Sequence, residues 1–87
     1  MNSALVVEFL GTALLLSAIA FAKNSLMIVA ALATAITLGA SVSGAHFNPA
    51  VTLFQLLKGN ISQTKATMYV LAQLAAAVSV SFLGRSL

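Results

Sequence analysis

Three long apolar segments limit the folds open to this chain more than any other feature. They cover residues 4–22, 26–42 and 66–83, and each is close to the ~20 residues that cross a ~30 Å hydrocarbon core as a helix. Hydrophobic residues make up 61% of the 87 residues and charged residues only 6%, far from the balance of soluble globular domains. The sequence therefore predicts a single-domain, all-α, multi-pass membrane protein with three transmembrane helices.

The first apolar segment has a competing interpretation as a secretory signal peptide. Ala20-Phe21-Ala22 has the small-x-small pattern of a cleavage site after an apolar run. A signal peptide also needs positive charge at its start, but residues 1–7 contain no Lys or Arg, and Glu8 interrupts the apolar run. We therefore predict that this segment is a membrane span.

A fourth segment, residues 43–57, is predicted to enter the membrane without crossing it. Asn48 is a favourable N-cap, and Pro49 fits the first position of a helix, where no amide hydrogen is needed. The helix would run for nine residues before Lys58-Gly59-Asn60 ends it, which is roughly 13 Å, or about half a span. Extended backbone before such a helix is tolerated at that depth only inside protein or beside a watery cavity. This combination predicts a re-entrant loop followed by a half-helix.

The run Ser43-Gly44-Ala45-His46-Phe47-Asn48-Pro49-Ala50-Val51-Thr52 resembles the first Asn-Pro-Ala loop of the aquaporin and glycerol-facilitator family. Glu8-Phe9-Leu10-Gly11-Thr12 resembles the family's first helix, and Tyr69 and Gln73 lie where its third helix often carries such residues. The family normally has two inverted repeats in one chain, whereas residues 1–87 contain one repeat. The resemblance implies three transmembrane helices plus one re-entrant half-helix, completed by an antiparallel second copy.

The function that the resemblance implies is passive transport of water and small neutral solutes such as glycerol. Two Asn-Pro-Ala motifs would meet in mid-membrane, with backbone carbonyls before each motif accepting hydrogen bonds from the solute. The family's filter arginine follows its second motif, and here valine follows the only motif. A filter aromatic often lies about twenty residues before the first asparagine, where isoleucine stands here. The residues expected at the pore are Gly44, Ala45, His46, Asn48, Pro49, Ala50, Val51 and Ile28.

Glu8 is the only acidic residue and lies within the first apolar segment. A carboxyl group inside a span is costly and usually faces a partner in the protein interior. It could relay protons or brace the loop, and the resemblance implies the brace, with Glu8 bonding the loop backbone or His46. Tyr69 and Gln73 lie four residues apart on one helix face. They are expected to satisfy loop backbone or to lie at a subunit contact, with pore lining as the less favoured alternative, and Gln73 is included among the bracing residues.

The four basic residues are divided equally between the two membrane surfaces. Lys58 and Lys65 would share one side with the N-terminus, and Lys23 and Arg85 would share the other. The positive-inside rule then has almost nothing to act on. We therefore predict that chains insert in both orientations and pair antiparallel. The family's tetramer implies that four such pairs assemble around an axis.

Several other classes of protein are disfavoured by composition. The chain has no cysteine, one histidine and one acid, so we expect no disulfide, no metal site, no cofactor and no enzymatic activity. It lacks the basic stripe of a nucleic-acid-binding protein, and its expected partner is the lipid of a plasma or inner membrane. Two alternatives stay open: a non-conducting half-channel that modulates full-length aquaporins, and a small lysis-type pore protein.

Overall fold

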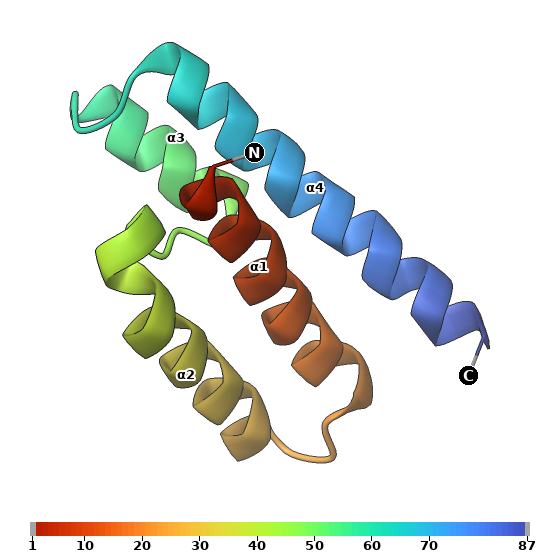
Figure 1. Ribbon diagram of the computed structural model, residues 1–87. Helices are drawn as coiled ribbons and strands as arrows, with labels where there is room; N and C mark the ends of the chain where they lie inside the picture. Colours follow the sequence, from red (N-terminus) through yellow and green to blue (C-terminus); the bar gives the residue numbers. More distant parts are fainter. Residues whose placement is uncertain (1, 87) are drawn as a thin grey trace.

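Four helices and no strand make up residues 2–86, the part of the chain that the computed structural model describes (Figure 1). Three helices are long and apolar enough to cross a membrane, and one is short. The prediction of an all-α fold with three spans and one half-helix is confirmed. The helices are α1 (Ser3–Phe21), α2 (Ser25–Ser43), α3 (Pro49–Leu57) and α4 (Gln63–Ser86).

Asparagine side chains cap the first three helices. Asn2 Oδ1 accepts from the backbone N–H of Leu5 at 2.9 Å, and Asn24 Oδ1 accepts from that of Met27 at 3.0 Å. Such caps satisfy amide hydrogens that have no partner within the helix. The helices therefore begin at these positions because of local chemistry, although the surrounding sequence is almost uniformly apolar.

The fourth helix begins three residues before the predicted start of the third span at residue 66. The Ser62 hydroxyl accepts from the backbone N–H of Lys65 at 3.1 Å, and the Ser62 carbonyl accepts from that of Ala66 at 2.9 Å. This serine cap lets the polar residues before the apolar segment join the helix. The polar connection between α3 and α4 is correspondingly shorter than predicted.

Helix α1 lies between α2 and α4 and packs against both, while α3 packs on α4 (Figure 1). The α3–α4 turn and the start of α1 lie at one end of the bundle, and the α1–α2 turn and the C-terminal end of α4 lie at the other. The longest dimension is 38 Å, enough to cross a ~30 Å hydrocarbon core. The irregular link between α2 and α3 therefore lies within the length of the bundle.

The distribution of side chains differs from that in a soluble domain. Long apolar side chains cover the surface, as with Leu38, which is 73% exposed, and Leu57, which is 77% exposed. The interior combines apolar side chains such as Phe47 and Val80 with an unusual number of polar ones, namely Glu8, Thr12, Ser43, His46, Thr52 and Gln73. In lipid, polar groups are costly at the surface and gather inside with partners.

Candidate functional site

The link between α2 and α3 has an unusual backbone. Gly44 has φ +88°, and the non-glycine residues Ala45 and Phe47 have φ +56° and +53°. The left-handed region is readily adopted by glycine but costs free energy for residues with a side chain, most of all for bulky ones. Such a conformation persists only where surrounding contacts hold it.

The carboxylate of Glu8 provides many of these contacts. Its Oε2 accepts from Ser43 Oγ at 2.7 Å and from the backbone N–H of His46 at 3.0 Å. Its Oε1 accepts from the backbone N–H of Phe47 at 2.8 Å and from Gln73 Nε2 at 3.0 Å. Four donors match the acceptor capacity of one carboxylate, and Glu8 is 0% exposed. One side chain on α1 thus contacts the end of α2, the loop and α4.

A second set of hydrogen bonds links α3 to the same cluster. Gln73 Nε2 also donates to Thr52 Oγ1 at 2.9 Å, and Thr52 Oγ1 lies 2.9 Å from His46 Nδ1. The Thr52 hydroxyl has one hydrogen to donate and two acceptor positions, so it can accept from Gln73 and still pair with His46 Nδ1 in either tautomer of the ring.

Tyr69 closes the cluster from α4. Its hydroxyl donates to the backbone carbonyl of Ser43 at 2.6 Å, and its ring meets that of His46 edge-on at a centroid distance of 4.9 Å. Lys65 Nζ lies 5.6 Å from the centroid of the same ring. Tyr69 therefore bonds backbone at the start of the loop, whereas Gln73, four residues later, bonds two side chains.

The N-terminus of α3 carries the remaining polar groups of the site. Asn48 Oδ1 accepts from the backbone N–H of Ala50 at 2.8 Å, and Pro49 occupies the first turn. Asn48 is exposed, and its Nδ2 makes no hydrogen bond among the described residues. The same holds for the carbonyl oxygens of residues 44–46. Donors and acceptors thus stand unpaired beside a helix N-terminus with a partial positive charge.

Two predicted pore residues lie apart from the buried cluster. Val51 is 38% exposed on the first turn of α3. Ile28 is half-buried near the start of α2, about 22 Å along the helix from Ser43 at 1.5 Å per residue. The structure brings Glu8, His46 and Gln73 together and places Ile28 near the opposite end of α2.

Sequence reasoning missed the roles of Ser43, Thr52 and Phe47. All three belong to residues 43–52. For Ser43 and Thr52 the available signal was a hydroxyl at membrane depth, where an unpaired polar group is costly, and for Phe47 the sequence offered no signal. Two buried oxygens, Thr12 Oγ1 and Gln73 Oε1, have no hydrogen-bond partner among the described residues. No group of three metal-ligating side chains occurs in that part of the chain.

Comparison with protein families identifies the family of this chain. A model of the major intrinsic protein family matches residues 1–85. The chain belongs to the major intrinsic protein family. As a family member with three helices that can span a membrane, it is an integral, multi-pass membrane protein.

Individual relatives carry aquaporin names. The chain is 34% identical over 90 residues to Aquaglyceroporin AqpS of Rhizobium meliloti (strain 1021), covering 85% of this chain and 39% of that protein. It is 50% identical over 48 residues to Probable aquaporin TIP1-2 of Oryza sativa subsp. japonica, covering 55% of this chain and 19% of that protein. The chain thus spans at most about two fifths of the length of these members of the major intrinsic protein family. No solved structure matches the chain.

Proposed function

We propose that this chain supplies one half of a passive channel for water and small neutral solutes such as glycerol. The exposed N-terminus of α3 carries this proposal, because it presents a free amide and a helix dipole part-way through the bundle. The names of the relatives, aquaporin and aquaglyceroporin, agree with this class of solute. Gly44, Ala45 and His46 contribute backbone acceptors, and Asn48, with Pro49 and Ala50 fixing its place, contributes the donor.

The donor and acceptor groups account for passage of solute without passage of protons. A water that accepts hydrogen bonds from two Asn48 amides has its oxygen occupied and is a poor link in a proton wire. Two α3 N-termini facing each other also make a positive potential that repels cations. Weak binding of the solute at several backbone carbonyls favours its movement along the pore.

The second half of the pore is proposed to be an inverted copy of this chain. Lys58 and Lys65 lie at the end of the bundle formed by the α3–α4 turn, and Lys23 and Arg85 lie at the other end. Equal charge at the two ends favours insertion in both orientations, and inverted repeats bring half-helix N-termini together at mid-membrane. Four such pairs around an axis form the proposed complete assembly.

The pore mouths of such a pair are proposed to be apolar. Val51 directly follows the Asn-Pro-Ala motif, and Ile28 lies near the start of α2. Neither side chain is charged, so neither replaces the family's filter arginine. The α3 dipoles and the two amides are then the main barrier to ions. Glu8, His46 and Gln73 are proposed to brace the loop, because every acceptor position of the carboxylate already has a donor.

Stopped-flow light scattering of proteoliposomes that contain the purified chain tests the channel directly. We expect faster shrinkage than in empty vesicles under a water gradient, and solute entry under a glycerol gradient. Shrinkage at the rate of empty vesicles would refute an autonomous channel and favour a half-channel that modulates full-length relatives. Leakage of large dyes together with water would favour a lysis-type pore.

Cross-linking of single cysteines tests the orientation of the pair, since the natural chain has no cysteine. In an antiparallel pair of the Asn48→Cys variant, the two introduced cysteines lie close together at mid-membrane. In an antiparallel pair of the Leu57→Cys variant, they lie at opposite membrane surfaces. We expect a short reagent to cross-link the first variant and not the second. Efficient cross-linking of Leu57→Cys would indicate parallel copies and contradict the proposed pair.

A further inference from the structure

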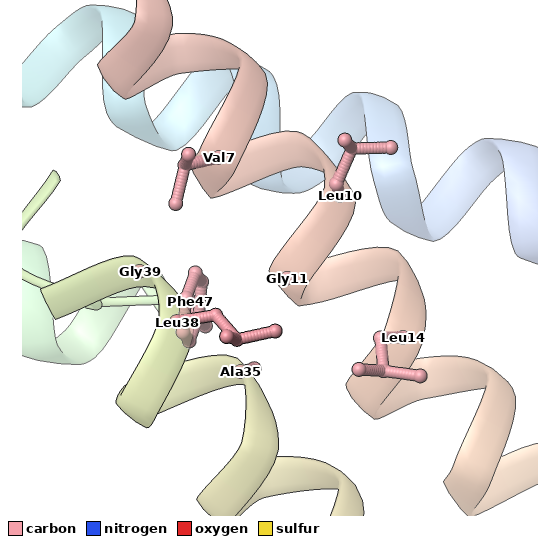
Figure 2. A pocket seen from close by; sticks show the side chains of 8 residues that line it. All are labelled: Val7, Leu10, Gly11, Leu14, Ala35, Leu38, Gly39 and Phe47. Atoms are coloured by element: carbon pink, nitrogen blue, oxygen red, sulfur yellow. The ribbon is translucent and has the colours of Figure 1, made fainter. Parts of the chain in front are cut away.

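We propose that Phe47 is a positioning residue, whose ring, held between glycines on two helices, fixes where Asn48 lies in the pore. The inference rests on the proposed function for its transport consequence, and its structural part stands without it. Phe47 directly precedes Asn48 and is 3% exposed. It belongs to the loop, yet its ring packs between α1 and α2 (Figure 2).

The ring occupies the space that side chains at two positions would need. A Cβ at Gly11 on α1 would lie 2.5 Å from Phe47 Cζ and 2.6 Å from Cδ1. A Cβ at Gly39 on α2 would lie 3.1 Å from Phe47 Cζ and 2.8 Å from Val7 Cγ1. Carbon atoms in ordinary contact are about 3.5–4.0 Å apart. Glycine at both positions is therefore what admits the ring.

The backbone of Phe47 is held independently of its ring. Its N–H donates to Glu8 Oε1 at 2.8 Å, and its φ of +53° is one that a bulky residue rarely adopts. With the amide held on one side and the ring on the other, the Cα of Phe47 has little freedom. The next residue in the chain is Asn48, so the two anchors of Phe47 together set where the Asn48 side chain begins, and loss of the ring leaves only the backbone hydrogen bond to hold that position.

A groove beside the ring gives it somewhere to move. The groove lies between α1 and α2, has a volume of about 220 Å³ and is lined by apolar residues that include Leu10, Leu14 and Leu38 (Figure 2). An added methyl group at Gly11 can therefore displace the ring toward the groove without separating the helices. This makes a positional effect measurable in chains that still fold.

Ordinary packing of an aromatic residue is the competing explanation, and the two predict different results. If Phe47 only fills space, its removal lowers the fraction of folded chains and leaves each folded chain unchanged. If Phe47 positions Asn48, folded chains also change in the environment of the Asn48 amide and in solute preference. The measurements must therefore be made per folded chain.

The test uses Phe47→Ala, Phe47→Leu, Gly11→Ala and the double variant Phe47→Ala with Gly11→Ala. Gly84→Ala is the matched control, because a Cβ at that helical glycine would meet only Phe21 Cζ, at 4.0 Å. Thermal unfolding in detergent gives the coupling between the two sites. The NMR signal of the Asn48 side-chain amide gives its environment, and stopped-flow gives the ratio of glycerol to water permeability.

We expect Gly11→Ala to lower the unfolding midpoint when Phe47 is present and to be neutral or stabilising when residue 47 is alanine. Phe47→Ala should move the Asn48 amide signal and change the permeability ratio several-fold per folded chain, with Phe47→Leu intermediate and Gly84→Ala unchanged. If the effects of Gly11→Ala and Phe47→Ala on the unfolding midpoint simply add, the ring does not depend on glycine at position 11, and this part of the inference is wrong. An unmoved amide signal in folded Phe47→Ala would overturn the positioning role. If the natural chain conducts nothing, the channel proposal fails, while the midpoint and amide measurements still decide this inference.

Discussion

Asn48 uses the two ends of one side-chain amide differently. Its oxygen accepts from the backbone N–H of Ala50 and caps α3, while its nitrogen is left without a partner among the described residues. An aspartate in its place would still cap the helix, because the carboxylate oxygen accepts in the same way. It would lose the donor and add a negative charge, so the two functions can be separated by one substitution.

Asn48→Asp should increase cation leakage through proteoliposomes while leaving the helix content unchanged. The added charge offsets the partial positive charge of the α3 N-terminus, and an increase of about tenfold corresponds to about 1.4 kcal/mol on the barrier. Asn24→Asp is the control, since Asn24 caps α2 with the same chemistry at the bundle end. Equal leakage from both variants would argue against a dipole barrier.

Glu8→Gln should destabilise the chain by about 2–4 kcal/mol, because one acceptor oxygen becomes an NH₂ group that faces two buried donors. Its solute flux should fall and should show no new dependence on proton concentration. Thermal unfolding and flux in proteoliposomes check both statements, with Ser17→Ala on the same helix as control. A proton current that is present in the natural chain and lost in Glu8→Gln, with solute flux intact, would instead identify a relay.

At the scale of elements, α3 is too short to be held by the bilayer alone. It packs on α4, and the Thr52 hydroxyl joins it to Gln73 on α4 and to His46 in the loop. The orientation of its N-terminus therefore depends on a few buried polar contacts. This differs from the long helices, which are also held by hydrocarbon along their length.

Thr52→Val tests this attachment, since valine has nearly the same shape but no hydroxyl. It leaves His46 Nδ1 and one hydrogen of Gln73 unpaired, at a cost of about 2 kcal/mol. Thr67→Val is the matched control on α4, where the exposed hydroxyl only returns to the Gln63 carbonyl at 2.9 Å. The difference in thermal midpoint between the two variants is the measurement, and equal midpoints would contradict an anchoring role for Thr52.

The short helix could be predicted from the sequence because its signals are local. Asn48 and Pro49 define its start, and the left-handed Gly59 follows its end. Burial of Glu8 demands donors without naming them, so the loop backbone, His46 and Gln73 could be expected around it only from the family resemblance. Ser43 and Thr52 escaped prediction because their partners come from helices 35 and 21 residues away. In uniformly apolar helices, periodicity does not show which face is buried.

At the scale of the whole molecule, orientation in the membrane depends on very few charges. Lys23→Gln would leave one basic residue at one end of the bundle and two at the other, so the chain should favour one orientation. We expect flux in cells to fall several-fold as antiparallel pairs become scarce, while Lys23→Arg keeps it. Co-expression with Lys58→Gln, which is biased the other way, should restore flux. Unchanged accessibility of terminal tags in Lys23→Gln would contradict dual insertion.

The burial of Glu8 has a consequence for how the chain is made. A ribosome delivers α1 first, but the donors to its carboxylate come from residues 43, 46, 47 and 73. Until they arrive, an acid in hydrocarbon costs a few kcal/mol. Part of the free energy that keeps α1 in the bilayer is therefore gained only when the later segments supply these donors.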